Sequence, residues 1–389
     1  MPNIVDRIIQ FNTRRNPELL AIKYRKMRDD VFAFFRGTCH LFYEEARLKS
    51  LLDDAPMVWI CGDLHLQNYG FYEGDDGLIY LDINDFDESL LAPVVWDVVR
   101  FLTSVHLSSP SRNASTQWPQ LFLDAYSSTI AQGQMRSVHT ATAPPLVRRV
   151  MEQRQQRDQT KLLKEYTDSE KSKRRFHAKR DKMLTIDDAA RNKAIAIVKT
   201  GSAGQPKKES YKVLDVATRL SGLGSMGVER YLMLVEGSIS NQLLELKQRL
   251  EPSAVLYADQ QPPWANSAER VVTLQRRLQA VPPAPLIAID YEGTAYTLRQ
   301  LYPADTKILA ETFTQPKSWR SLIETMGKIA AYAHLRGCGR QKASGIDDLI
   351  SFVGGSEWRG KVVKYSRDCA KQASEDYDVF CKSKLGRDA

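Results

Sequence analysis

Short apolar stretches separated by turn residues predict several β-strands in this chain. Two stretches lie early, at 57–60 and 78–81. Four more follow the middle of the chain, at 228–235, 241–246, 286–290 and 294–301. The last two flank Glu292-Gly293, a polar-Gly pair of the kind that turns a hairpin. The pattern therefore predicts an antiparallel sheet over the second part of the chain.

Helical spacing of apolar residues is clearest at 267–280, where Val271, Leu274 and Leu278 recur at intervals of three and four. Further helices are predicted at 29–50, 94–106, 119–131, 317–335 and 356–383. Helix-rich segments thus lie on both sides of the strand-rich segment. We expect an α+β protein in which the first and last parts of the chain pack together.

Composition indicates a folded protein. The 389 residues are 43% apolar and 9% aromatic, which is typical of globular chains. No run of 18 apolar residues predicts a membrane span, and the first residues lack the pattern of a secretory signal. The five cysteines are odd in number and scattered, so they indicate neither a disulfide framework nor a zinc site. We expect a cytoplasmic protein without a membrane partner.

The formal net charge of +8 comes largely from a basic stretch at 148–180. One interpretation is a solvated helix or linker between two parts of the fold. The other is a basic flap that guides a phosphorylated or nucleic-acid substrate. The sequence contains no recognisable nucleic-acid-binding motif, so a nucleic-acid partner is not expected.

The strongest chemical signal follows the strand at 57–60. Residues 62–68 read Gly-Asp-Leu-His-Leu-Gln-Asn, which places Asp63 five residues before Asn68. In a phosphotransferase, such an acid accepts the proton of the attacking hydroxyl and such an amide ligates Mg²⁺. After the next strand, Asp82 and Asp85 are rival candidates for a second metal ligand. The alternative interpretation is a polar loop between edge strands, because Asp, Asn and Gly are common in turns.

A second signal lies at 222–227, Gly-Leu-Gly-Ser-Met-Gly, with Gly222, Gly224, Ser225 and Gly227 as candidate phosphate-binding residues. The same pattern occurs in dinucleotide-binding folds, but there a strand precedes the glycines and a helix follows them. Here a strand, a turn, a second strand and then Lys247 follow, which is the order of a kinase nucleotide-binding hairpin.

Lys247 is expected to contact phosphate oxygens as a point charge. Glu269, in the first turn of the helix at 267–280, is a candidate to orient this lysine. The alternative role for Glu269 is to stabilise the N-terminus of its own helix.

These motifs resemble the aminoglycoside and choline kinase branch of the protein-kinase-like superfamily. The resemblance makes Asp63 the catalytic base, Asn68 a magnesium ligand and Asp85 the later metal-binding aspartate. His65 would lie near the transferred phosphate or hydrogen-bond the loop backbone. Asp97 resembles the aspartate that braces the catalytic loop from a following helix. Cys61 stands where that branch has histidine.

The order of the motifs is circularly permuted, because the catalytic loop precedes the glycine-rich loop. In this respect the chain resembles an uncharacterised bacterial domain-of-unknown-function family with four shared motifs, at 34–37, 62–68, 84–87 and 222–227. The resemblance implies a two-lobed protein-kinase-like fold. Its parts would be a large-lobe segment at 1–147, a basic linker or flap at 148–204, a small nucleotide-binding lobe at 205–302 and helices returning to the large lobe at 303–389.

The predicted function is magnesium-dependent transfer of the γ-phosphate of ATP to a hydroxyl of a small-molecule or protein acceptor. Two rivals use the same residues. One is a nucleotide-binding pseudokinase without catalysis, and the other is a nucleotidyltransferase that binds the nucleotide in reverse and transfers AMP.

Overall fold

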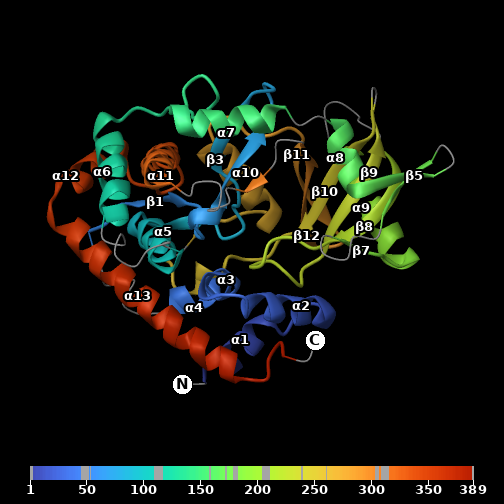
Figure 1. Cartoon of the computed structure of the whole chain (residues 1–389), viewed down its shortest axis with the longest axis horizontal. Helices are drawn as coiled ribbons and strands as arrows, with labels where there is room; N and C mark the ends of the chain where they lie inside the picture. The colour runs from blue at the N-terminus through green and yellow to red at the C-terminus, as the bar shows by residue number, and fades with distance from the viewer. Residues whose placement is uncertain are drawn as a thin grey trace.

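The chain folds into a mixed α+β protein with antiparallel sheets, which confirms the broad fold prediction. The structure is a computed structural model, and it describes residues 3–44, 52, 54–108, 117–156, 159–170, 173–177, 183–203, 211–237, 240–259, 261–302, 306–307 and 315–387. Most helices gather on one side of the molecule and the largest sheet lies on the other (Figure 1).

The largest sheet has six strands in the order β11-β12-β10-β9-β8-β7, and every neighbouring pair is antiparallel. Its strands are β7 (Met183–Leu184), β8 (Lys212–Arg219), β9 (Arg230–Glu236), β10 (Gln242–Gln248), β11 (Leu286–Tyr291) and β12 (Thr294–Leu301). The four strands predicted after residue 227 are therefore confirmed. Lys247 lies within β10 rather than after it.

Alternation along β10 gives this sheet two different faces. Leu244 and Leu246 point to one face, where they belong to an apolar cluster completed by α9 (Asp188–Ala203). Glu245 and Lys247 alternate with these leucines and lie on the opposite face. Both charged residues are buried, with 2% and 3% exposure. Two buried charges on one sheet face indicate a polar interior beside the sheet.

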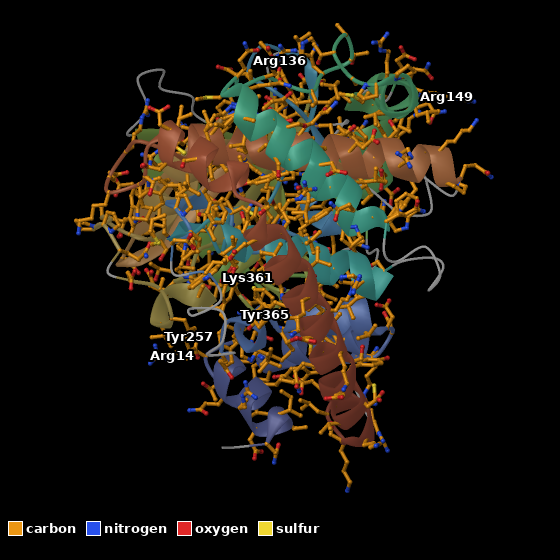
Figure 2. The ribbon with its side chains drawn as sticks, turned by 90° about the vertical axis from the view of Figure 1, so that its left-hand side faces the viewer. Arg14, Arg136, Arg149, Tyr257, Lys361 and Tyr365 are labelled. Carbon is orange, nitrogen blue, oxygen red and sulfur yellow. The ribbon has the colours of Figure 1, made fainter. Side chains whose placement is uncertain are left out.

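The main apolar core lies in a helical body on the other side of the molecule. Its helices are α5 (Val95–Ser108), α6 (Gln117–Gln132), α11 (Pro316–Arg336), α12 (Ile346–Gly354) and α13 (Glu357–Lys382). Figure 2 shows α13 along the side of this body, marked by Lys361 and Tyr365. The helices predicted at 94–106, 119–131, 317–335 and 356–383 are confirmed, and they share one core as expected.

Short strands flank the segment at 62–68 within this body. β1 (Met57–Ile60) pairs with β4 (Leu90–Pro93), and β2 (Tyr69–Glu73) lies between β3 (Ile79–Ile83) and β13 (Thr306–Lys307). The helix α10 (Ser267–Leu278) contacts both β1 and the sheet strands β11 and β12. It therefore joins the helical body to the six-stranded sheet.

The N-terminal helices form a separate layer at the bottom of Figure 1. They are α1 (Ile4–Asn12), α2 (Pro17–Met27), α3 (Val31–Gly37) and α4 (Cys39–Glu44). The single helix predicted at 29–50 is two helices, because Thr38 has a non-helical backbone between them. Residues 45–50 of that prediction lie outside the described residues.

The basic stretch at 148–180 is partly packed, which differs from a wholly solvated linker. Its elements are α7 (Pro145–Gln155), α8 (Gln159–Tyr166), β5 (Thr167–Glu170) and β6 (Lys173–Phe176). Leu162, Leu163 and Tyr166 of α8 are buried in an apolar cluster of the sheet. Residues 157, 158, 171, 172 and 178–180 of this stretch lie outside the described residues.

The elements that pack in and on the six-stranded sheet begin before residue 205, the predicted first residue of the small lobe. Both α9 and β7 precede that residue, and both pack with strands β8–β12.

Among the described residues, none of the helices combines the length and apolar character that a membrane span requires.

Candidate functional site

A cavity of about 780 Å³ is lined both by the loops of the helical body and by the six-stranded sheet. This volume is typical of sites for small ligands. The predicted site residues that line it are Asp63, His65, Asn68, Asp85, Gly222, Gly224, Ser225 and Gly227. The structure therefore brings the two predicted motifs, which are far apart in the sequence, to one cavity.

Asp63 follows β1 at the floor of this cavity and pairs with a buried arginine. Arg100 of α5 donates from Nη2 and Nε to Asp63 Oδ1 at 2.8 and 2.9 Å. Arg100 has no exposed surface and also lies over the ring of Phe35 at 3.7 Å. Burial raises the pKa of Asp63, and the Arg100 guanidinium opposes that rise. The carboxylate is thus held in one orientation by a fixed cation.

Asp97 of α5 braces the loop that carries Asp63. Its two carboxylate oxygens accept hydrogen bonds from the backbone amides of Cys61 and Gly62, both at 3.0 Å. His334 of α11 lies 3.2 Å from the same carboxylate through Nε2. This arrangement confirms the bracing role expected for Asp97. The neighbouring Gly62 admits no side chain, because a Cβ atom there would collide with the carbonyl of Glu88.

Asn68 is positioned to present its amide oxygen to a ligand. Its Nδ2 donates to the carbonyls of Asp63 and Asp85, at 2.9 and 3.2 Å. Its Oδ1 is buried and has no hydrogen-bond partner among the described residues. A buried amide oxygen without a partner is costly unless a ligand or water satisfies it.

Asp85 lines the cavity beside Asn68, whereas Asp82 points elsewhere. Asp82 is buried on β3 and accepts hydrogen bonds from the amides of Ile83 and Ala280, at 2.8 and 3.0 Å. Asn68 and Asp85 supply an amide oxygen and a carboxylate, which are ligands that Mg²⁺ takes together with phosphates and waters. The residues present therefore fit a magnesium ion shared with a phosphate ligand. Within the described residues there is no group of three or more His, Cys, Asp or Glu side chains that could hold a metal.

Lys247 connects the six-stranded sheet to the loop that carries Asp85 and Asp87, but it is not among the residues that line the cavity. Its Nζ forms an ion pair with Asp87, and Arg249 of the following turn pairs with the other oxygen of the same carboxylate. Burial lowers the pKa of Lys247 to about 8, although the nearby Asp85 carboxylate raises it. The structure pairs Lys247 with Asp87 rather than with Glu269. Glu269 is exposed and accepts a hydrogen bond from the amide of Ala265, at the start of its own helix.

Two basic side chains of the N-terminal segment, Arg15 and Lys23, donate hydrogen bonds to the backbone of the glycine-rich loop. Arg15 donates to the carbonyls of Gly224 and Met226 at 2.6 and 3.1 Å. Lys23, which is fully buried, donates to the same Gly224 carbonyl at 3.3 Å. These contacts fix the backbone of the loop where it lines the cavity. These contacts could not be predicted from the sequence, because residues 15 and 23 belong to no recognisable motif.

An arginine cluster on the sheet wall was also not predicted. Arg219, Arg230 and Arg299 all pair with Glu245, with closest N–O distances of 2.6, 2.6 and 3.0 Å. The three arginines line the cavity. Burial alone would raise the pKa of Glu245, but the three guanidinium groups hold it well below its usual range. One feature of the sequence could have indicated this cluster. Glu245 precedes Lys247 by two residues on a predicted strand, and alternate residues of a strand lie on the same face.

Some residues that line the cavity were not assigned a role in the sequence analysis. Arg36 lines it and donates to Gln67 Oε1 at 2.6 Å. His65 accepts a hydrogen bond from the amide of Gln67 at 3.1 Å, and its Nε2 lies 3.7 Å from Asp63. The first of these contacts agrees with a loop-bracing role for His65. Arg14, labelled in Figure 2, lines the cavity from the turn between α1 and α2.

A comparison with protein families matches residues 15–383 to the model described as "Uncharacterized protein conserved in bacteria (DUF2252)". No curated protein and no solved structure matches the chain. The family match covers all the cavity residues from Arg15 onward.

Proposed function

The chain belongs to this uncharacterised bacterial family, and from that premise we propose that it is a magnesium-dependent transferase that uses ATP. It would move a phosphorus-containing group from the nucleotide to the hydroxyl of a small-molecule or protein acceptor. The observation that carries this proposal is that Asp63, Asn68 and Asp85 share one cavity with the glycine-rich loop, while Lys247 of the sheet pairs with Asp87 in the same loop as Asp85. The proposal includes a protein-kinase-like arrangement of two lobes with permuted motif order.

Asp63 is the proposed base. In phosphoryl transfer the acceptor oxygen forms a bond to the γ-phosphorus, and the bond from that phosphorus to the β–γ bridging oxygen breaks. ADP leaves with the electron pair, and the acceptor proton moves to the Asp63 carboxylate. Arg100 holds this carboxylate from behind, which fixes the oxygen that faces the acceptor. Such sites act mainly by positioning and electrostatics.

Asn68 and Asp85 would hold the magnesium ion, which neutralises phosphate charge when bound. The orphaned Oδ1 of Asn68 supports this assignment, since a ligand to that oxygen removes the cost of its burial. Asp82 is not included, because backbone amides occupy its carboxylate.

Transfer of AMP is a second candidate, and one observation favours it. The sheet wall beside Lys247 carries the arginine cluster around Glu245, where an apolar surface would suit an adenine base better. The acceptor oxygen would then attack the α-phosphorus and pyrophosphate would leave.

Calorimetric titration of the full chain with MgATP tests the shared claim of both candidates. Saturable binding that requires Mg²⁺, together with label transfer from radioactive ATP in cell extract, is the expected result. Binding without turnover under any condition would identify a nucleotide-binding regulator instead of an enzyme. No binding of any nucleoside triphosphate would refute the proposed function.

A further inference from the structure

The sheet wall of the cavity carries more positive than negative charge. Arg219, Arg230 and Arg299 share the single carboxylate of Glu245, and Lys247 and Arg249 share that of Asp87. These side chains are between 3% and 23% exposed, so water screens them poorly. The cavity wall formed by these strands thus gathers three arginines around one buried carboxylate.

Three guanidinium groups that line one cavity present several N–H donors to a ligand that enters it. A ligand that suits them is anionic and matches the planar geometry of guanidinium groups. Phosphate is the chemical match, because its oxygens accept paired hydrogen bonds from the planar guanidinium. The three arginines converge on Glu245 and also line the cavity, so a ligand there meets them together.

The part of this wall beside Lys247 suits a purine base poorly. A base needs flat apolar or aromatic surface on its faces. The strand residues that line the cavity there are instead Arg230, directly opposite Lys247 on β9, and Arg299 on β12. A base placed there would bury polar groups without satisfying their charge.

We propose that Arg219, Arg230 and Arg299 form a binding site for the β- and γ-phosphates of the nucleotide. The inference rests on the proposed function, since it takes a nucleoside triphosphate as the ligand of this cavity. With the terminal phosphates against the sheet, the α-phosphate faces Asp63, Asn68 and Asp85. The reaction is then nucleotidyl transfer.

The chemical step follows from this orientation. The acceptor oxygen forms a bond to the α-phosphorus, and the bond between that phosphorus and the α–β bridging oxygen breaks. Pyrophosphate leaves with the electron pair and stays paired with the arginines. The acceptor proton moves to Asp63.

The binding test compares ATP, AMP and inorganic tripolyphosphate by calorimetry on the full chain. We expect tripolyphosphate to compete with ATP, and Arg219→Gln to weaken both ligands about 10- to 100-fold, as expected for the loss of a charge-assisted hydrogen bond. AMP affinity should change little. Arg191→Gln is the matched control, because Arg191 pairs with Asp215 outside this cavity. It should leave all three affinities unchanged.

The inference is overturned if Arg219→Gln weakens AMP and ATP equally, or leaves ATP and tripolyphosphate binding intact. Arg299→Gln serves as the second variant should Arg219→Gln fail to fold. The products of slow ATP hydrolysis, with water as acceptor, give an independent readout. AMP and pyrophosphate support the inference. ADP and phosphate contradict it while leaving the broader proposed function standing, whereas absence of MgATP binding by the unmodified chain refutes both.

Discussion

Lys247 on β10 forms an ion pair with Asp87, a residue 160 positions earlier in the chain. Asp87 belongs to the loop that also carries Asp85, and that loop lines the cavity with Asp63 and Asn68. The pair thus links the sheet to the loop at 84–88, which lines the same cavity as Asp63 and Asn68. The proposed site therefore requires that the segment around Asp87 and the strand that carries Lys247 lie next to each other in the fold.

Asp63→Asn should reduce the rate of transfer by about 100-fold or more, the usual effect of losing a general base. The amide still offers an oxygen to Arg100, so the buried arginine keeps a partner and the fold survives. MgATP affinity should change little, because Asp63 acts on the acceptor. Label transfer and calorimetry measure the two effects.

Asp124→Asn is the control for this variant, since Asp124 pairs with Arg359 on the surface and has an exposed side chain. It should retain full activity. Equal losses of binding and turnover in Asp63→Asn would argue that Asp63 holds the nucleotide instead.

Asp85→Asn and Asp82→Asn separate the two rival metal ligands. Asp85 lines the cavity, so its change should raise the Mg²⁺ concentration needed for ATP binding by about tenfold, as for a lost ligand contact. Asp82 accepts two backbone hydrogen bonds away from the cavity, so its change should lower thermal stability and leave the Mg²⁺ requirement unchanged. A Mg²⁺ titration of ATP binding in both variants checks this. A shift in Asp82→Asn alone would reverse the assignment.

Lys247→Met should weaken MgATP binding about 10- to 100-fold through loss of one charge-assisted contact. The pKa of about 8 also predicts a pH dependence. Below pH 8 Lys247 is protonated and attracts phosphate, and above pH 8 it loses its charge, so ATP affinity should fall as the pH rises through 8. Titrations from pH 6.5 to 9.5, on the order of one unit to each side of that pKa, measure the profile. The fall should be absent in Lys247→Met, and the same slope in both proteins would exclude Lys247 as its source.

Gly222→Ala should impair nucleotide binding by distorting the glycine-rich loop. Gly222 has φ +76°, which strains any other residue, and a Cβ atom there would lie 2.8 Å from Nη1 of Arg230. Gly77→Ala is the matched control, because Gly77 has φ +77° but nothing within 4 Å of an added Cβ. Both variants should lose about 1 kcal/mol or more of unfolding free energy. Only Gly222→Ala should weaken MgATP binding, and equal binding in the two would remove the loop from the site.

Asp97→Asn tests the brace of the catalytic loop. Its amide can accept only one of the two backbone hydrogen bonds from Cys61 and Gly62. We expect the free energy of unfolding in urea to fall by about 1–3 kcal/mol, the cost of a buried amide without a partner. Transfer should slow with little change in MgATP affinity, because Asp97 positions Asp63 and touches no ligand. Unchanged stability would show that the brace is dispensable.

The local elements of this fold were predictable because each depends on short-range pattern. The strands β9 to β12 follow from apolar runs and the Glu292-Gly293 turn, and α10 follows from its apolar spacing. The brace at Asp97 was expected from its place after the catalytic loop. The side-chain contacts between segments that are distant in the sequence could not be predicted from local sequence patterns.

The partner of Lys247 illustrates this limit. Glu269 fits the usual position of a helix glutamate, yet it accepts a hydrogen bond from the Ala265 amide just before its own helix, and Asp87 pairs with the lysine. The contacts of Arg15 and Lys23 with the glycine-rich loop, and those of three arginines with Glu245, also join residues with no shared local pattern. Such contacts depend on tertiary packing, which periodicity does not encode.

A crystal structure of the full chain with Mg²⁺ and a non-hydrolysable ATP analogue tests the central claim most directly. The account predicts polyphosphate density between the segment from Asp63 to Asp85 and the sheet wall that bears Lys247, with the metal ion at Asn68 and Asp85. Nucleotide density elsewhere on the surface, or a cavity that stays without nucleotide at saturating analogue, would contradict it.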